Sequence, residues 1–203
     1  MTFEKRKLYN HEDSGKVFLY ALLLPFVLSL VFSMVADQIA LGMAVKPEVV
    51  TGSIWYIVAF SIASFGLYLG LYFVYTKTKN IEYSAIKLSF KTKWHTTLLM
   101  IAIGVVVLFG LQYFVGVFDN LLKAIGFPFE EGLSSINPTT FGEYALAVVI
   151  LAILPAIGEE LLFRGMIFNG LRERFKDWTA IFLSGLMFAL MHTNLQQFVF
   201  LLL

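Results

Sequence analysis

The sequence predicts an all-α fold, a polytopic transmembrane helical bundle with about five full spans and the start of a sixth. Apolar residues make up 59% of the 203 residues and charged residues 14%, whereas a typical soluble domain has about 47% and about 25%. The charges gather between long uncharged stretches and do not alternate with apolar residues on a helical period, as they would in a soluble core helix. A water-soluble enzyme is therefore excluded.

Five apolar stretches reach the roughly 20 residues that a helix needs to cross about 30 Å of hydrocarbon. They are residues 17–36, 55–75, 94–118, 144–170 and 178–192. A cleaved signal peptide is the alternative for the first stretch, but its apolar region is longer than the usual length of about 7 to 15 residues. Residues 198–203 read as the start of a sixth helix and are too few to span, so we expect further spans beyond them.

Lysine and arginine gather at alternate ends of the predicted spans. They are Lys5, Arg6, Lys7 and Lys16 in the leading tail, five lysines in residues 77–93, and Arg172, Arg174 and Lys176 after the fourth stretch. Short loops rich in these residues stay in the cytoplasm. We therefore expect an integral cell membrane protein with a cytoplasmic amino terminus.

The remaining composition excludes several kinds of partner and site. A formal net charge of +1 excludes a strongly basic nucleic-acid-binding protein. The lipid bilayer is the surroundings that the apolar composition predicts. The absence of cysteine excludes disulfides, thiolate zinc sites and cysteine nucleophiles. No repeat or linker interrupts residues 1–203, which predicts a single integral membrane domain. The spacing of Gly66 and Gly70 is typical of a helix-packing notch.

Three ionisable residues interrupt the fourth stretch, and intramembrane charges are functional candidates because they are costly to bury. Glu160 and Arg164 are four residues apart, which predicts an ion pair on one helix face. Glu159 is rotated about 100° from Glu160 and can point elsewhere. Pro155 cannot bond the carbonyl of Leu151, which predicts a kink and a polar acceptor near the carboxylates.

His192 ends the fifth stretch at a depth similar to that of Glu159. Counted from the cytoplasmic ends of antiparallel neighbouring spans, the two residues lie roughly 16 and 21 Å deep at about 1.5 Å per residue. A carboxylate and an imidazole that meet in an apolar bundle could activate water, either directly as a general base or through a metal. The alternatives are a structural ion pair for Glu160 and Arg164, and a hydrogen-bonded helix-end histidine for His192.

These residues resemble the CPBP or Abi family of intramembrane proteases, which includes the type II prenyl-protein (CAAX) endopeptidases. The resemblance rests on Glu159-Glu160-x-x-x-Arg164 in one span and Phe188-x-x-x-His192 in the next. It covers about residues 144–192 and is expected to continue beyond the end of this chain.

The resemblance implies that Glu159 activates water for peptide-bond hydrolysis and that Glu160 and Arg164 shape and support the site. It also implies that His192 joins Glu159 around the water or a metal. A Zn²⁺ ion held by Glu159 and His192 would still need a third protein ligand, so its presence stays open. A third motif of the family, His followed four residues on by Asn, is absent from this sequence.

Two functions follow. The first is an intramembrane endopeptidase acting on a membrane-associated or prenylated peptide. The second is a non-catalytic scaffold or immunity protein of the same fold that binds a membrane protein partner, which the missing third motif favours. A transporter that uses Glu159 as a proton relay is a more distant alternative.

Overall fold

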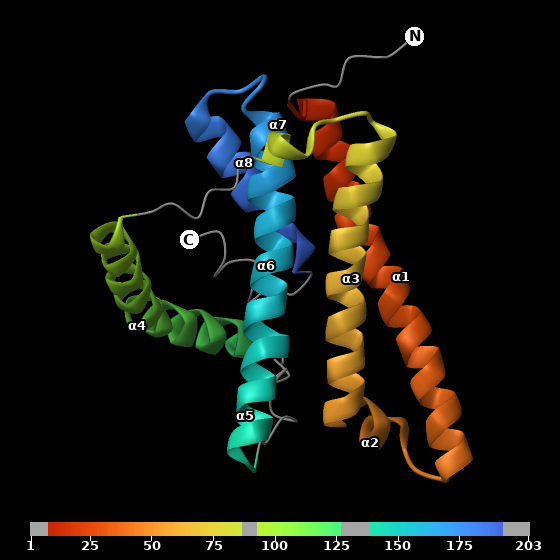
Figure 1. Ribbon diagram of the computed structural model, residues 1–203. Helices are drawn as coiled ribbons and strands as arrows, with labels where there is room; N and C mark the ends of the chain where they lie inside the picture. The colour runs from red at the N-terminus through yellow and green to blue at the C-terminus, as the bar shows by residue number, and fades with distance from the viewer. Residues whose placement is uncertain (1–7, 87–92, 127–138, 193–203) are drawn as a thin grey trace. The chain divides into compact units, whose positions relative to one another are not determined.

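The computed structural model describes residues 8–86, 93–126 and 139–192. All secondary-structure elements in these ranges are helices, and no strand occurs among them (Figure 1). The all-α prediction is therefore confirmed. Two compact units result from the contacts within the chain, residues 1–87 with 133–184 and residues 88–132 with 185–203.

Four described helices are long and apolar enough to cross a membrane. They are His11–Met43, Ile54–Thr78, Trp94–Ala124 and Phe141–Leu171. These helices contain the first four predicted spans. The fifth forms α8 (Asp177–Met191), whose 15 residues cover about 22 Å at 1.5 Å per residue, less than a full hydrocarbon core. The predicted sixth helix lies outside the described residues.

Within the first unit, α1 (His11–Met43) and α3 (Ile54–Thr78) pack side by side as an antiparallel pair (Figure 1). Their connection contains α2 (Pro47–Thr51), with its proline in the first turn, where a missing N–H is not needed. Ser53 then caps α3 by accepting a hydrogen bond from the backbone N–H of Tyr56 (3.3 Å). A short 3₁₀ turn, Tyr83–Ile86, follows α3.

A buried polar cluster joins the start of α1 to the end of α3. The hydroxyls of Tyr9 and Thr76 lie 2.7 Å apart, and the Tyr75 hydroxyl donates a 2.9 Å hydrogen bond to the Asp13 carboxylate. Burial raises the pKa of Tyr9 to about 12, so this phenol stays neutral at pH 7. Because its buried polar groups bond to one another, the cluster sets the register of the two helices at little desolvation cost.

The start of α1 also anchors the fourth membrane helix. The Ser14 hydroxyl donates a 2.8 Å hydrogen bond to the carbonyl of Ile167. Gly170 lies so close that an added Cβ would collide with the Ser14 hydroxyl and the Asn10 carbonyl. Asn10 is itself held as the N-cap of α1, where its side chain accepts a hydrogen bond from the Asp13 N–H (2.8 Å). Asn10 and Ser14, which precede the first predicted span, therefore hold α1 against the fourth membrane helix.

The fourth membrane helix is continuous but changes its winding. It contains α5 (Phe141–Val148), α6 (Leu154–Glu160) and α7 (Asn169–Leu171), separated by π-helical segments at Val149–Ile153 and Leu161–Phe168. The second unit contains α4 (Trp94–Ala124) and the end of α8. Within the described residues, no residue in the most apolar window of α4 is buried.

Candidate active site

The two adjacent glutamates end α6, between the two π-helical segments. Pro155 accounts for the first segment, because it has no N–H to offer the carbonyl of Leu151. The sequence predicts a kink there, and the structure shows a wider, π-helical turn at Val149–Ile153. Such π-bulges within α-helices occur frequently at functional sites. The glutamates therefore lie in a locally irregular part of the membrane helix.

Gly158 brings α3 against α6 immediately before the first glutamate. A Cβ at position 158 would lie 2.8 Å from Cδ2 of Tyr68 and 3.5 Å from Cδ2 of Phe65. A larger residue would therefore displace the Tyr68 ring. The charge of Glu159 acts on the phenol of Tyr68, and the ring of Tyr68 lies against Gly158, the residue before Glu159.

Sequence reasoning missed Tyr68, because a tyrosine in an apolar stretch is unremarkable without knowledge of its neighbour. Its hydroxyl is a polar group in the middle of an uncharged span, and buried tyrosine hydroxyls usually find a polar partner. The need of this hydroxyl for a polar partner was the signal in the sequence that could have identified Tyr68. The partner itself lies about ninety residues further along the chain, so only the fold identifies it.

Glu160 and Arg164 form the ion pair that their spacing predicts, with 2.8 Å between Oε1 and Nη1. Their side chains are 43% and 66% exposed, respectively. The pair is therefore not enclosed by its own unit, which differs from the fully buried pair that the sequence allows.

Asn169 supports the second π-helical segment and is another residue that sequence reasoning missed. Its side-chain amide donates hydrogen bonds to the carbonyls of Arg164 (2.8 Å) and Gly165 (3.0 Å). A π-helical turn shifts the backbone hydrogen bonds by one residue. The Asn169 amide supplies donors to the carbonyls of Arg164 and Gly165 within this turn. Asn169 therefore stabilises the helix at the residue that pairs with Glu160.

His192 lies in the second unit, just after α8. Its Nδ1 is 2.9 Å from the carbonyl of Phe188, and the two rings meet edge to face with centroids 4.8 Å apart. The Phe188-x-x-x-His192 spacing therefore produces a local contact that orients the imidazole. With Nδ1 at this carbonyl, Nδ1 is the ring nitrogen that carries a proton.

The structure thus brings together Glu160 and Arg164, and packs Tyr68 against Gly158, the residue before Glu159. The predicted meeting of Glu159 with His192 falls between the two units and stays a prediction. No group of three His, Asp or Glu side chains that could hold a metal ion occurs within residues 8–86, 93–126 and 139–192. These residues do not form the three-ligand set of a zinc site, so we derive no step through a metal.

Comparison with known families agrees with the motifs. Residues 141–203 match the type II CAAX prenyl endopeptidase Rce1-like family. This match confirms the resemblance, over a region that contains both motifs. Neither the curated proteins nor the solved structures include a match to the chain. Together with four helices suited to crossing a bilayer, the match indicates an integral membrane protein with a region similar to CAAX proteases.

We expect Arg164→Ala to lower the free energy of unfolding by about 1 kcal/mol, as for a part-exposed ion pair. A fully buried pair would lose about 3 to 5 kcal/mol, because Glu160 would be left as an uncompensated buried charge. Unfolding of the two proteins in the same detergent measures the difference. A loss in the larger range would mean that the pair is enclosed in the intact protein.

Proposed function

We propose that this protein is an intramembrane endopeptidase that hydrolyses a peptide bond in a membrane-associated or prenylated peptide, using water activated by Glu159. The observation that carries the proposal is a pair of adjacent carboxylates, Glu159 and Glu160, between two π-helical segments of a membrane helix. Glu160 is 2.8 Å from Arg164, and the charge of Glu159 acts on Tyr68 of α3. The family match of residues 141–203 supports the same activity.

In the proposed reaction the Glu159 carboxylate takes a proton from water as the water oxygen attacks the carbonyl carbon of the substrate. The tetrahedral intermediate then collapses, the C–N bond breaks, and Glu159 returns its proton to the leaving amine. General acid–base catalysis of this kind contributes about 10² to 10⁴ in rate. No oxidant or further reactant is required.

Two other groups assist this step in the proposal. Arg164 holds Glu160 at 2.8 Å, which keeps the second carboxylate from competing for the proton. His192, oriented by the Phe188 carbonyl at its Nδ1, would in its doubly protonated form donate from Nε2 to the oxygen that gains charge in the intermediate. Donors aimed at a developing oxyanion are usually a large contribution to catalysis.

Purified natural protein in detergent tests the activity directly. We expect it to cleave a farnesylated CAAX peptide, and the same peptide without the farnesyl group shows whether the lipid is needed. A parallel reaction with a chelator, followed by zinc addition, tests for a metal requirement. Absence of cleavage, with binding of a membrane protein that depends on Glu159, would favour the scaffold function instead.

Orientation of the active site follows from the distribution of lysine and arginine. We expect a cysteine at Ser84, an exposed residue after α3, to be protected from an impermeant thiol reagent in intact cells. A cysteine at Lys46, exposed before α2, should react. Because the chain has no native cysteine, both probes report single positions. The opposite labelling pattern would invert the topology.

A further inference from the structure

A groove between α1 and α3, entirely within the first unit, is not used by the proposed reaction. It has a volume of about 570 Å³, within the range of about 300 to 1,000 Å³ that is common for ligand sites. Its lining is Tyr20 and Leu24 from α1, and Gly66, Leu67, Gly70, Leu71, Val74, Tyr75, Thr78 and Lys79 from α3 and its end. The groove is therefore apolar along most of its length and cationic at one end.

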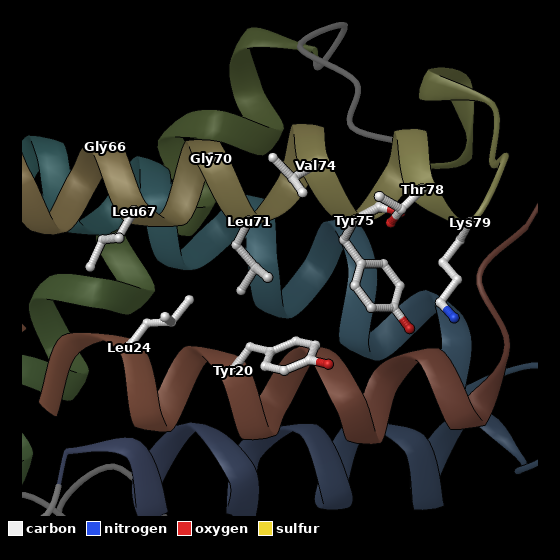
Figure 2. Close-up of a pocket in the computed structure, with 10 residues that line it drawn as sticks. All are labelled: Tyr20, Leu24, Gly66, Leu67, Gly70, Leu71, Val74, Tyr75, Thr78 and Lys79. Carbon is white, nitrogen blue, oxygen red and sulfur yellow. The ribbon is translucent and has the colours of Figure 1, made fainter. Parts of the chain in front are cut away.

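The glycine pair on α3 keeps this groove open. No atom lies within 4 Å of a Cβ built at Gly66 or at Gly70. The sequence predicts a helix-packing notch from their spacing, and within the described residues no neighbouring helix fills the space beside either glycine. Figure 2 shows Leu67 and Leu71 directed from α3 toward α1, with Leu24 facing them across the groove. The missing side chains leave space that an apolar chain can fill.

The opposite end of the groove is polar and positively charged. Lys79 follows the last turn of α3, with its ammonium 6.0 Å from the centre of the Tyr75 ring. Tyr20 and Tyr75 face each other there, with ring centroids 6.3 Å apart (Figure 2). Tyrosine and lysine are the residues that hold a membrane protein at the headgroup level. This end therefore lies where a lipid phosphate would be found.

The length of the groove corresponds to one leaflet. From Gly66 to Lys79 the helix rises about 20 Å at 1.5 Å per residue. One hydrocarbon leaflet is about 15 Å thick, and the headgroup region adds several ångströms. A phosphate at Lys79 would thus leave an acyl chain beside the two glycines.

From this charge and length we infer that the groove between α1 and α3 binds an anionic phospholipid, with an acyl chain along Gly66 and Gly70 and the headgroup phosphate at Lys79. Basic sites between membrane helices on the cytoplasmic side are a recognised place for anionic headgroups. The inference concerns lipid binding and does not depend on peptide cleavage.

The test uses vesicles of equimolar phosphatidylglycerol and phosphatidylcholine with identical acyl chains. The natural protein is reconstituted, extracted again in mild detergent, and the lipids that remain bound are quantified by mass spectrometry. We expect wild type to retain phosphatidylglycerol preferentially. Lys79→Gln should reduce this preference about fivefold, the contribution of one lysine near an anionic surface, and Lys79→Arg should retain it.

Two further variants separate charge from shape. Lys77→Gln removes a neighbouring lysine that does not line the groove and should leave the preference unchanged. Gly70→Leu should lower the amount of both bound lipids, because the new side chain occupies the open groove. A phosphatidylglycerol with a photoreactive group in the acyl chain should label Leu67 or Leu71, which reports the position of the lipid in wild type without any substitution.

Several results would overturn the inference. They are equal retention of both lipids by wild type, equal effects of Lys79→Gln and Lys77→Gln, or photolabelling confined to other helices. Displacement of the lipid by a farnesylated peptide, with equal efficiency in wild type and Lys79→Gln, would instead assign the groove to the prenyl chain of a substrate. Each outcome is read from bound lipid and is independent of proteolysis.

Discussion

Glu159→Gln is expected to reduce peptide cleavage by about 10² to 10⁴, the contribution of a positioned general base. The amide has the same shape as the carboxylate but cannot accept a proton from water. It is also cheaper to bury than a charged group, so the protein should remain folded. Cleavage of a farnesylated peptide, measured beside thermal unfolding in detergent, separates the two effects.

Matched variants show whether the effect belongs to this carboxylate. Tyr68→Phe removes the neighbouring hydroxyl and keeps the ring against Gly158, so we expect a smaller loss of activity than from Glu159→Gln. His192→Ala should resemble Glu159→Gln, with activity lost and folded protein retained. An active Glu159→Gln protein would end the proposed mechanism.

Gly170→Ala is expected to destabilise the first unit strongly. The new methyl group would collide with the Ser14 hydroxyl and the Asn10 carbonyl. Neither can move easily, because Ser14 bonds Ile167 and Asn10 caps α1. Overpacking of a rigid site costs about 1 to 3 kcal/mol, and we expect the upper end of that range for a collision with backbone.

The control for this substitution is Gly66→Ala. No atom lies within 4 Å of an added Cβ at Gly66, and alanine is a better helix former than glycine by about 0.5 to 1 kcal/mol. We therefore expect opposite changes in the free energy of unfolding from the same chemical substitution. Equal effects at Gly66 and Gly170 would contradict the close contact between α1 and α7.

Local spacing predicted part of the candidate site correctly. Residues four apart on a helix share a face, and Glu160 and Arg164 do form a pair at 2.8 Å. The same rule accounts for the contact of His192 with the Phe188 carbonyl. Both contacts depend on one helix only, so no knowledge of the tertiary fold was needed to expect them.

Contacts between different helices could not be predicted from the sequence. Tyr9 bonds Thr76 and Tyr75 bonds Asp13 across more than sixty residues, and no periodic pattern specifies such partners. The Gly66 and Gly70 spacing illustrates the same limit. A pair of small residues permits a neighbouring helix to approach, but whether a helix or a groove lies there depends on where that helix runs.

The sequence by itself determined the all-α class, four of the helices that are long and apolar enough to cross a membrane, and the charged residues that interrupt the fourth. Those properties depend on the transfer of each segment from water to hydrocarbon, which is nearly additive along the chain. Only the tertiary structure decided that Tyr68 packs against Gly158, that the start of α1 anchors Gly170, and that a groove remains between α1 and α3. These depend on the close packing of side chains from distant segments, which is set by shape rather than by hydropathy.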